Sequence, residues 1–250
     1  MRSSLAISLL FLAACSSAEG PERPAAGEPV ADAGAPAPAP ETVSEPAPPK
    51  DAGSDAAPPP PSGCGRAVSG VGALTERSLK ALGKDRTFHL SIPAGYDPKT
   101  PHALLFVLHG ATDTTPQYMR DWFPVEGGMT DVIAVYPQAL VRTRPDGSGG
   151  AVTRWDLYGD EDTAFFDAVL AEIASTHCVD RGKVFATGFS SGGNFAHQLA
   201  CLRSSAVRAI GPVAGPGPFT DKCGGPVAVW MTHDVDDQGL SVVRGRAIGS

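Results

Sequence analysis

The sequence predicts an α/β fold with a mostly parallel sheet and helices on both of its faces. Three observations support this prediction. Short apolar runs of strand length alternate with helical stretches over most of the chain, and strands that alternate with helices form parallel sheets. One of these runs leads through a glycine-flanked serine turn directly into a helix. The composition changes near position 64, which leaves residues 64–250 as a domain long enough for a single core.

The elements of this domain can be placed by their apolar patterns. Six runs have the length and composition of strands: residues 87–92, 104–108, 132–136, 184–187, 209–213 and 227–231. The clearest helix covers residues 162–175, where apolar residues such as Phe166 and Ile173 share one face. Asp162 is the expected N-cap of this helix. The glycine-rich residues 144–150 are predicted to form a surface loop.

The strand at 184–187 continues into the most specific motif of the chain. Residues 183–193 read K-V-F-A-T-G-F-S-S-G-G, a strand, a tight turn and the start of a helix. Side chains at the positions flanking the turn would collide, so Gly188 and Gly192 are required there. This context is the nucleophile elbow of the α/β-hydrolase fold, with Ser190 as the candidate catalytic nucleophile. A glycine-rich turn without chemistry is the alternative interpretation.

An oxyanion hole should accompany this nucleophile. Its first donor is expected to be the backbone N–H of Ser191, the residue after the nucleophile. The second donor should come from the loop after an earlier strand. The run 104–108 ends at His109-Gly110-Ala111, so the N–H of Ala111 is the candidate. We interpret His109 as a structural residue that shapes this loop, because the catalytic base follows the serine in this fold.

The triad acid is expected after the run 227–231. That run is followed by H-D-V-D-D, which places several carboxylates at the end of a strand. Asp237 is the preferred acid and Asp236 the second candidate. Spacing alone does not separate the acidic residues of this segment. A solvated acidic turn is the alternative interpretation of this segment.

The catalytic histidine should follow the acid in the chain. The sequence has six histidines, at positions 89, 102, 109, 177, 197 and 233. None of them follows Asp237. We therefore interpret the 250 residues as part of a longer hydrolase, with the C-terminal strand and helix missing and the base beyond residue 250. This interpretation predicts exposed apolar surface on one face of the sheet. The alternative is a surface-tethered pseudoenzyme or binding module that keeps the fold without the catalytic histidine.

Several motifs together resemble a known family, the LpqC-like group of polyhydroxybutyrate depolymerases and feruloyl esterases. The matching stretches are S-G-C-G at 62–65, I-P-A-G-Y-D-P at 92–98, L-H-G at 108–110, V-Y-P-Q at 135–138, W-D-L at 155–157, D-T-A-F-F-D at 162–167, C-V-D through G-G at 178–193, P-V-A-G at 212–215 and 233–237. The resemblance covers about residues 62–250, without the C-terminal G-H region of the family. It implies a secreted serine carboxylic ester hydrolase that acts through an acyl-enzyme and needs no organic cofactor. The implied substrate is a feruloyl or acetyl ester of plant polysaccharide, or a hydroxyalkanoate polyester.

The N-terminus predicts export and a lipid anchor. Residues 1–4 form a short basic region, and residues 5–12 form an apolar stretch too short to span a bilayer. The following L-A-A-C resembles a bacterial lipobox, in which Cys15 is lipidated and becomes the first mature residue. The serines after Cys15 suggest the outer membrane, if the cell has two membranes. An ordinary secretory signal cleaved near Ala14 is the alternative.

A linker is predicted between the anchor and the domain. Residues 16–63 contain 13 proline and 12 alanine residues and lack aromatic residues, so they cannot bury enough surface to order. They also carry eight acids and two bases, a charge of −6 out of the total of −7. The domain is therefore nearly neutral, and this charge balance argues against a nucleic-acid partner. A membrane contact is expected through the lipid only.

Cysteine usage also indicates an exported domain. Apart from Cys15 there are four cysteines, Cys64, Cys178, Cys201 and Cys223, which predict two disulfides with three possible pairings. Cys201 with Cys223 is the preferred pair, because it would tie the end of the nucleophile helix to the segment before the acid strand. Four buried thiols are the alternative. The chain contains no C-x-x-C or H-E-x-x-H motif to support a metal site.

Overall fold

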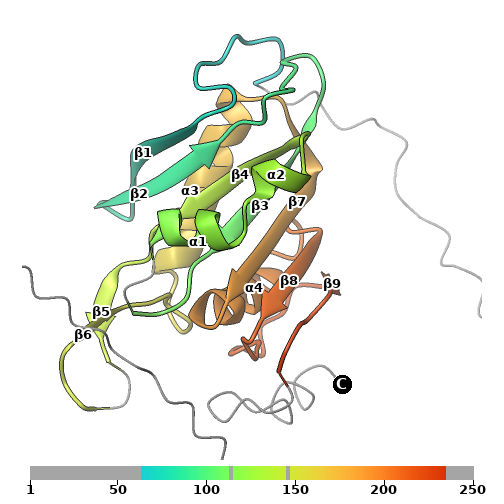
Figure 1. The fold of residues 1–250 in the computed structure, drawn as a ribbon. Helices are drawn as coiled ribbons and strands as arrows, with labels where there is room; N and C mark the ends of the chain where they lie inside the picture. Colours follow the sequence, from blue (N-terminus) through green and yellow to red (C-terminus); the bar gives the residue numbers. More distant parts are fainter. Residues whose placement is uncertain (1–62, 113–114, 145–146, 235–250) are drawn as a thin grey trace, which may run out of the picture. The chain divides into compact units, whose positions relative to one another are not determined.

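The computed structural model describes residues 63–112, 115–144 and 147–234 (Figure 1). The predicted lipidation site Cys15, the linker before residue 63 and both acid candidates, Asp236 and Asp237, lie outside the described residues. The predictions for those positions therefore remain predictions. Within the described residues, no helix has the length and apolar character needed to cross a membrane.

A seven-stranded sheet forms the centre of the domain, in the order β1-β2-β4-β3-β7-β8-β9. The strands are β1 Leu74–Ala81, β2 Lys84–Ser91, β3 His102–Leu108, β4 Val132–Pro137, β7 Val179–Phe189, β8 Ala209–Val213 and β9 Ala228–Val229. Strand β1 pairs antiparallel with β2, and β2 pairs antiparallel with β4. All pairings from β4 to β9 are parallel. The predicted mostly parallel sheet is confirmed.

Helices cover both faces of this sheet, as Figure 1 shows. The helices are α1 Pro116–Trp122, α2 Val125–Gly128, α3 Glu161–Thr176 and α4 Ser191–Leu202. On the α1 side, Met119 packs with Val107, Ala134 and Tyr136 in a small buried cluster. On the other side, residues of α3 and α4 form the main core with the strands. Burial on both faces explains why β3 and β4 are continuous apolar runs rather than alternating ones.

All six predicted strands are present, although their lengths differ. Strand β9 has only two residues, and both are exposed. Strand β1 escaped prediction because exposed polar residues interrupt its sequence, L-T-E-R-S-L-K-A. A small hairpin of β5 (Val141–Thr143) and β6 (Ala151–Thr153) was also not predicted. The glycine-rich stretch 144–150 connects these two strands, in agreement with the predicted loop.

The expected N-cap role of Asp162 is wrong. Helix α3 starts one residue earlier, at Glu161, and Asp160 occupies the cap position without a side-chain cap hydrogen bond. Asp162 points inward and is buried, where its carboxylate pairs with Arg86 and Arg142. These partners lie far away in the sequence, so local pattern could not identify them.

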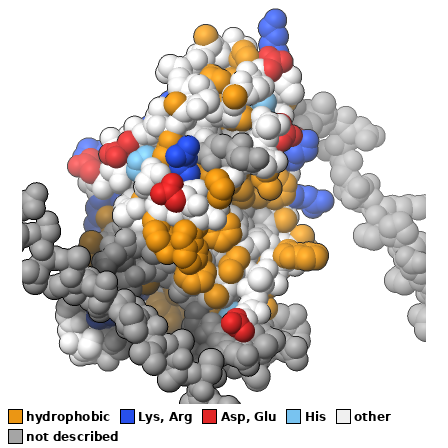
Figure 2. Space-filling view, viewed as in Figure 1, with side chains coloured by type: hydrophobic (Ala, Val, Ile, Leu, Met, Phe, Trp, Pro, Cys, Tyr) orange, Lys and Arg blue, Asp and Glu red, His pale blue; other side chains and the backbone are white. Residues whose placement is uncertain are grey.

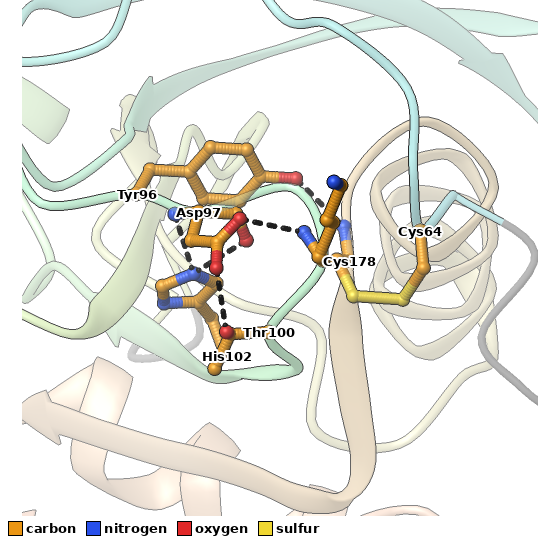
Figure 3. The surroundings of a disulfide bond; sticks show 7 residues. Cys64, Tyr96, Asp97, Thr100, His102 and Cys178 are labelled. Atoms are coloured by element: carbon orange, nitrogen blue, oxygen red, sulfur yellow. Dashed lines mark hydrogen bonds between the residues drawn. A yellow bond between two sulfur atoms is a disulfide. The ribbon is translucent and has the colours of Figure 1, made fainter.

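Two disulfides join the four cysteines of the domain, Cys64–Cys178 and Cys201–Cys223. The preferred pair Cys201–Cys223 is confirmed. Figure 3 shows how the other disulfide is surrounded. The hydroxyl of Tyr96 accepts a hydrogen bond of 2.8 Å from the N–H of Cys178, and the Tyr96 ring stacks on His102 at 4.7 Å. This disulfide fixes the first described residues to the start of β7.

The α1 face carries an apolar groove of about 660 Å³, and Figure 2 shows apolar side chains gathered over this face. The groove lies between the α1–α2 segment and strands β3, β7 and β8, with Leu105, Trp122, Phe185 and Ile210 in its lining. Trp122 is 55% exposed. Exposed apolar surface on one face of the sheet was predicted, and the described residues show it.

This groove should bind an apolar dye. We expect a blue-shifted rise in anilinonaphthalene sulfonate fluorescence on adding the folded 250-residue chain, because contiguous apolar surface is accessible. Trp122→Glu should reduce the rise, since it places a charge at the groove wall. Near-ultraviolet circular dichroism should show fixed tertiary packing in the same sample. A rise that is insensitive to Trp122→Glu would place the dye elsewhere.

Candidate active site

Ser190 lies at the turn between the end of β7 and the start of α4. Its backbone has φ 52° and ψ −117°, a conformation that is strained for a residue with a side chain. Two hydrogen bonds hold this conformation. The Ser190 N–H donates to the carbonyl of Val213 at 2.9 Å, and the Ser190 carbonyl accepts from the N–H of Asn194 at 2.9 Å. The predicted strained turn is confirmed.

The two flanking glycines are required by close backbone approach. A Cβ on Gly188 would lie 2.5 Å from the carbonyl carbon of Gly192. A Cβ on Gly192 would lie 2.6 Å from the carbonyl oxygen of His109. No side chain fits at either distance, so the strand, turn and helix can approach the β3 loop this closely only with glycine at both positions.

Both predicted oxyanion donors lie beside Ser190 in the fold. Ser191 is the first residue of α4, so its N–H belongs to the helix terminus that lacks intrahelical partners. On the other side, a Cβ on Gly110 would lie 3.7 Å from the Cβ of Ser190, which brings the loop carrying Ala111 next to the serine. The next residue, Thr112, anchors this loop by donating to the carbonyl of Thr153 at 3.0 Å. The roles of Ala111 and Ser191 as donors remain predictions.

His109 has the structural position that the sequence predicts. Its ring is fully buried, with Nδ1 2.7 Å from the carbonyl oxygen of Gly110. Nε2 lies 3.0 Å from the backbone nitrogen of Ala139, which donates to it. The backbone carbonyl of His109 accepts from the Trp155 indole at 2.7 Å. Both ring nitrogens therefore hold the loop that faces Ser190, in agreement with a structural role.

Burial of His109 should make stability depend on pH. Desolvation lowers the pKa of His109 to about 4, although its hydrogen bond to Gly110 opposes the change. The ordinary value is about 6.5, so between these values the unfolded chain binds more protons than the folded one. The free energy of unfolding therefore has its full value, as far as His109 is concerned, above about pH 6.5. It falls by up to about 3 kcal/mol as the pH drops to 4.

Urea unfolding at pH 7 and pH 5 measures this effect, and His109→Gln should show a smaller difference between the two. Nuclear magnetic resonance of the imidazole in the folded protein provides the control. The His109 ring should stay neutral at pH 5. A ring that titrates near pH 6.5 would contradict this assignment.

Trp155 is a positioning residue that sequence reasoning missed. It is buried and stacks on Phe195 of α4 with ring centroids 4.9 Å apart and an interplanar angle of 1°. Its backbone N–H donates to the Ser191 hydroxyl at 3.3 Å, and its indole donates to the His109 carbonyl. Trp155 therefore links the β3 loop to the start of α4. The signal in the sequence was the motif W-D-L at 155–157. On its own this motif supports the family resemblance but gives Trp155 no particular role.

Among the described residues, none forms a hydrogen bond with the side chain of Ser190, the candidate nucleophile. His233 follows β9, while His102 and His177 lie at the amino ends of β3 and β7, at the far edge of the sheet from Ser190. Within the described ranges, no group of three His, Cys, Asp or Glu side chains could hold a metal ion.

Comparison with known proteins agrees with this geometry. A family profile described as "Esterase FrsA-like" matches residues 141–219. Feruloyl esterase D of Neurospora crassa is 30% identical over 193 residues, which cover 75% of this chain and 65% of that protein. Feruloyl esterase C of Emericella nidulans is 33% identical over 171 residues, covering 64% and 58%. The chain thus spans less than two thirds of the length of these relatives.

Solved structures show the same fold. A thermostable esterase superposes with a TM-score of 0.54 at 18% identity, covering 70% of this chain and 50% of that one. The esterase Est2 of the Planctomycetes species Thermogutta terrifontis has a TM-score of 0.54 at 14% identity, covering 70% and 75%.

The parallel sheet, the elbow and these superpositions define an α/β-hydrolase fold of the kind found in esterases. Within that class, the predicted resemblance to feruloyl esterases is confirmed by the sequence relatives. The resemblance to polyhydroxybutyrate depolymerases stays a prediction.

Proposed function

We propose that this protein is an extracellular serine carboxylic ester hydrolase that acts through an acyl-enzyme. The observation that carries the proposal is the strained Ser190 at a glycine-flanked turn, with the Gly110–Ala111 loop packed beside it. Strain of this kind persists only where the surrounding structure enforces it, and it holds the hydroxyl at the end of the strand. A turn without chemistry would not need this conformation.

The proposed reaction has two half-steps. Ser190 Oγ attacks the ester carbonyl while a histidine takes its proton, and the N–H groups of Ala111 and Ser191 stabilise the oxyanion. The histidine then gives the proton to the leaving alcohol as the carbon–oxygen bond breaks. Water hydrolyses the acyl-enzyme by the reverse proton transfers. Asp237 is proposed to orient this histidine.

The proposed substrate is a feruloyl or acetyl ester on plant polysaccharide, with a hydroxyalkanoate polyester as the second candidate. The relatives named feruloyl esterase support the first. The proposed location is the cell surface, with Cys15 lipidated and residues 16–63 as the tether. Two disulfides within the domain support export, because such bonds persist in oxidising compartments.

The experiment that tests the proposal is active-site labelling of the complete protein. A fluorophosphonate probe should label it, and mass spectrometry should map the adduct to the peptide that contains Ser190. Release of ferulate from methyl ferulate, of nitrophenol from p-nitrophenyl acetate and of monomer from hydroxybutyrate oligomers then ranks the substrate classes. An unlabelled, folded protein that hydrolyses none of them would favour the pseudoenzyme or binding module.

A further inference from the structure

Two aromatic side chains meet at the edge of the sheet that carries the nucleophile turn. Tyr158 lies in the loop between β6 and α3, and Phe219 lies in the loop after β8. Their rings contact each other in a T-shaped arrangement, with centroids 6.3 Å apart and an interplanar angle of 75°. Because β8 is parallel to β7, the loop after β8 begins at the same edge of the sheet as Ser190. The pair therefore lies at the edge where the proposed chemistry takes place.

The loop that carries Tyr158 is fixed to the nucleophile turn. The backbone N–H of Trp155 donates to the Ser191 hydroxyl at 3.3 Å. The Asp156 carboxylate accepts from the backbone N–H of Tyr158 at 3.2 Å, which shapes the next part of this loop. The three residues from Trp155 to Tyr158 span at most about 11 Å. Tyr158 is thus held near the residue that follows the nucleophile.

The loop that carries Phe219 packs against the nucleophile helix. A Cβ on Gly215 would lie 2.7 Å from the Cα of Gly193, in the first turn of α4, so this loop passes close against the start of the helix. The disulfide Cys201–Cys223 then joins the loop to the last turn of α4. Both rings are therefore presented by loops whose positions α4 helps to fix.

This arrangement leaves an aromatic surface open to a ligand. Tyr158 is 79% exposed although it contacts Phe219, whereas Trp155 in the same loop is buried against Phe195. An aromatic side chain on a fixed loop loses little conformational freedom on binding, and it gains apolar burial and ring–ring contact from a second ring. A single exposed aromatic residue is ordinary on a protein surface. Two that meet from separate loops beside the nucleophile form a surface suited to an aromatic group.

We propose that Tyr158 and Phe219 form a subsite for the aromatic ring of the acyl group, so that this site prefers aromatic acyl esters to acetyl esters. The proposal rests on the proposed function of Ser190. With the carbonyl oxygen at the N–H groups of Ala111 and Ser191, an acyl chain that crosses the start of α4 brings a terminal ring to Tyr158. An acetyl group is too short to make this contact.

The test compares methyl ferulate with methyl acetate as substrates of the complete protein. Both esters release methanol, so the ratio of their kcat/KM values reports the acyl group alone. Tyr158→Ala should lower this ratio about tenfold, through the loss of one aromatic contact and its burial. The loss should appear in the KM for methyl ferulate, because the ring is bound equally in the ground and transition states. Tyr158→Phe keeps the ring and should retain at least about half of the ratio.

Tyr118→Ala is the matched control. Tyr118 is also an exposed tyrosine that contacts one aromatic ring, that of Trp122 at 5.0 Å, but it belongs to α1 on the other face of the sheet from α4 (Figure 1). This variant should change the ratio by less than about twofold. An equal fall of the ratio in Tyr118→Ala and Tyr158→Ala would overturn the subsite. So would a ratio that Tyr158→Ala leaves unchanged.

Binding to the Ser190→Ala protein separates this proposal from the proposed function. Calorimetry with methyl ferulate should give a Kd below about 1 mM, and adding Tyr158→Ala should weaken it about tenfold. If the complete protein hydrolyses both esters without preferring methyl ferulate, the subsite is overturned and the proposed function stands. If it hydrolyses neither, the proposed function fails, and Tyr158-dependent binding of methyl ferulate would still support the subsite. Absence of that binding would overturn it.

Discussion

Replacing Ser190 with alanine is expected to lower the kcat of the complete protein on methyl ferulate by about 10⁵–10⁶. The triad acts as a unit, so removing the nucleophile removes the acyl-enzyme route altogether. The residual rate should come from the oxyanion donors and from binding, which is about 10³–10⁴ above the uncatalysed reaction. The measurement is ferulate release under saturating substrate.

Two controls make this result interpretable. Ser175→Ala removes an exposed serine of α3 whose hydroxyl contacts only its own helix, and it should leave kcat unchanged. The Ser190→Ala protein should retain its far-ultraviolet circular dichroism, because the backbone hydrogen bonds to Val213 and Asn194 do not use the side chain. If Ser190→Ala loses less than about tenfold in kcat, another nucleophile is responsible.

The elbow could be predicted because its determinants are local. The apolar end of β7, Gly188, Ser190, Gly192 and the start of α4 are consecutive, so the residues that constrain one another are also neighbours in the sequence. The strands β3 and β4 were predictable for a related reason. Most of their residues are buried, and burial on both faces leaves a continuous apolar run that needs no knowledge of the partner strands.

Features that depend on distant partners could not be predicted. Strand β1 is held by pairing with β2, and its exposed Glu76 and Lys80 obscure its alternation. The inward orientation of the Asp162 side chain depends on Arg86, which is 76 residues away in the sequence. An aspartate in a first helical turn ordinarily suggests a cap or a dipole interaction. Only the fold reveals that this carboxylate is part of the core.

The Asp162 carboxylate accepts hydrogen bonds from buried residues that support the candidate site. One oxygen accepts from Arg86 at 2.6 Å, and the other accepts from Arg142 at 3.0 Å and from the backbone N–H of Asp156 at 2.6 Å. Its side chain is 0% exposed and that of Arg86 is 1% exposed. Asp156 follows Trp155, which holds the start of α4. Asp156 and Trp155 therefore connect the Asp162–Arg86 ion pair to the start of α4, next to the nucleophile turn.

Asp162→Ala is expected to lower the free energy of unfolding by about 3–5 kcal/mol, because it leaves the buried Arg86 charge uncompensated. Urea unfolding followed by circular dichroism measures the loss. Asp85→Asn is the matched control, because its partner Lys80 forms an exposed ion pair that should contribute nothing measurable.

A second variant separates the cost of an unpaired charge from the loss of packing. If the unpaired guanidinium is the cause, Arg86→Met combined with Asp162→Leu should recover most of the stability lost in Asp162→Ala, since an apolar pair removes the charge. The backbone N–H of Asp156 would still lack its acceptor, so recovery of the free energy of unfolding should be incomplete. A double variant no more stable than Asp162→Ala would show that the packing of this carboxylate, rather than charge compensation, stabilises the folded domain.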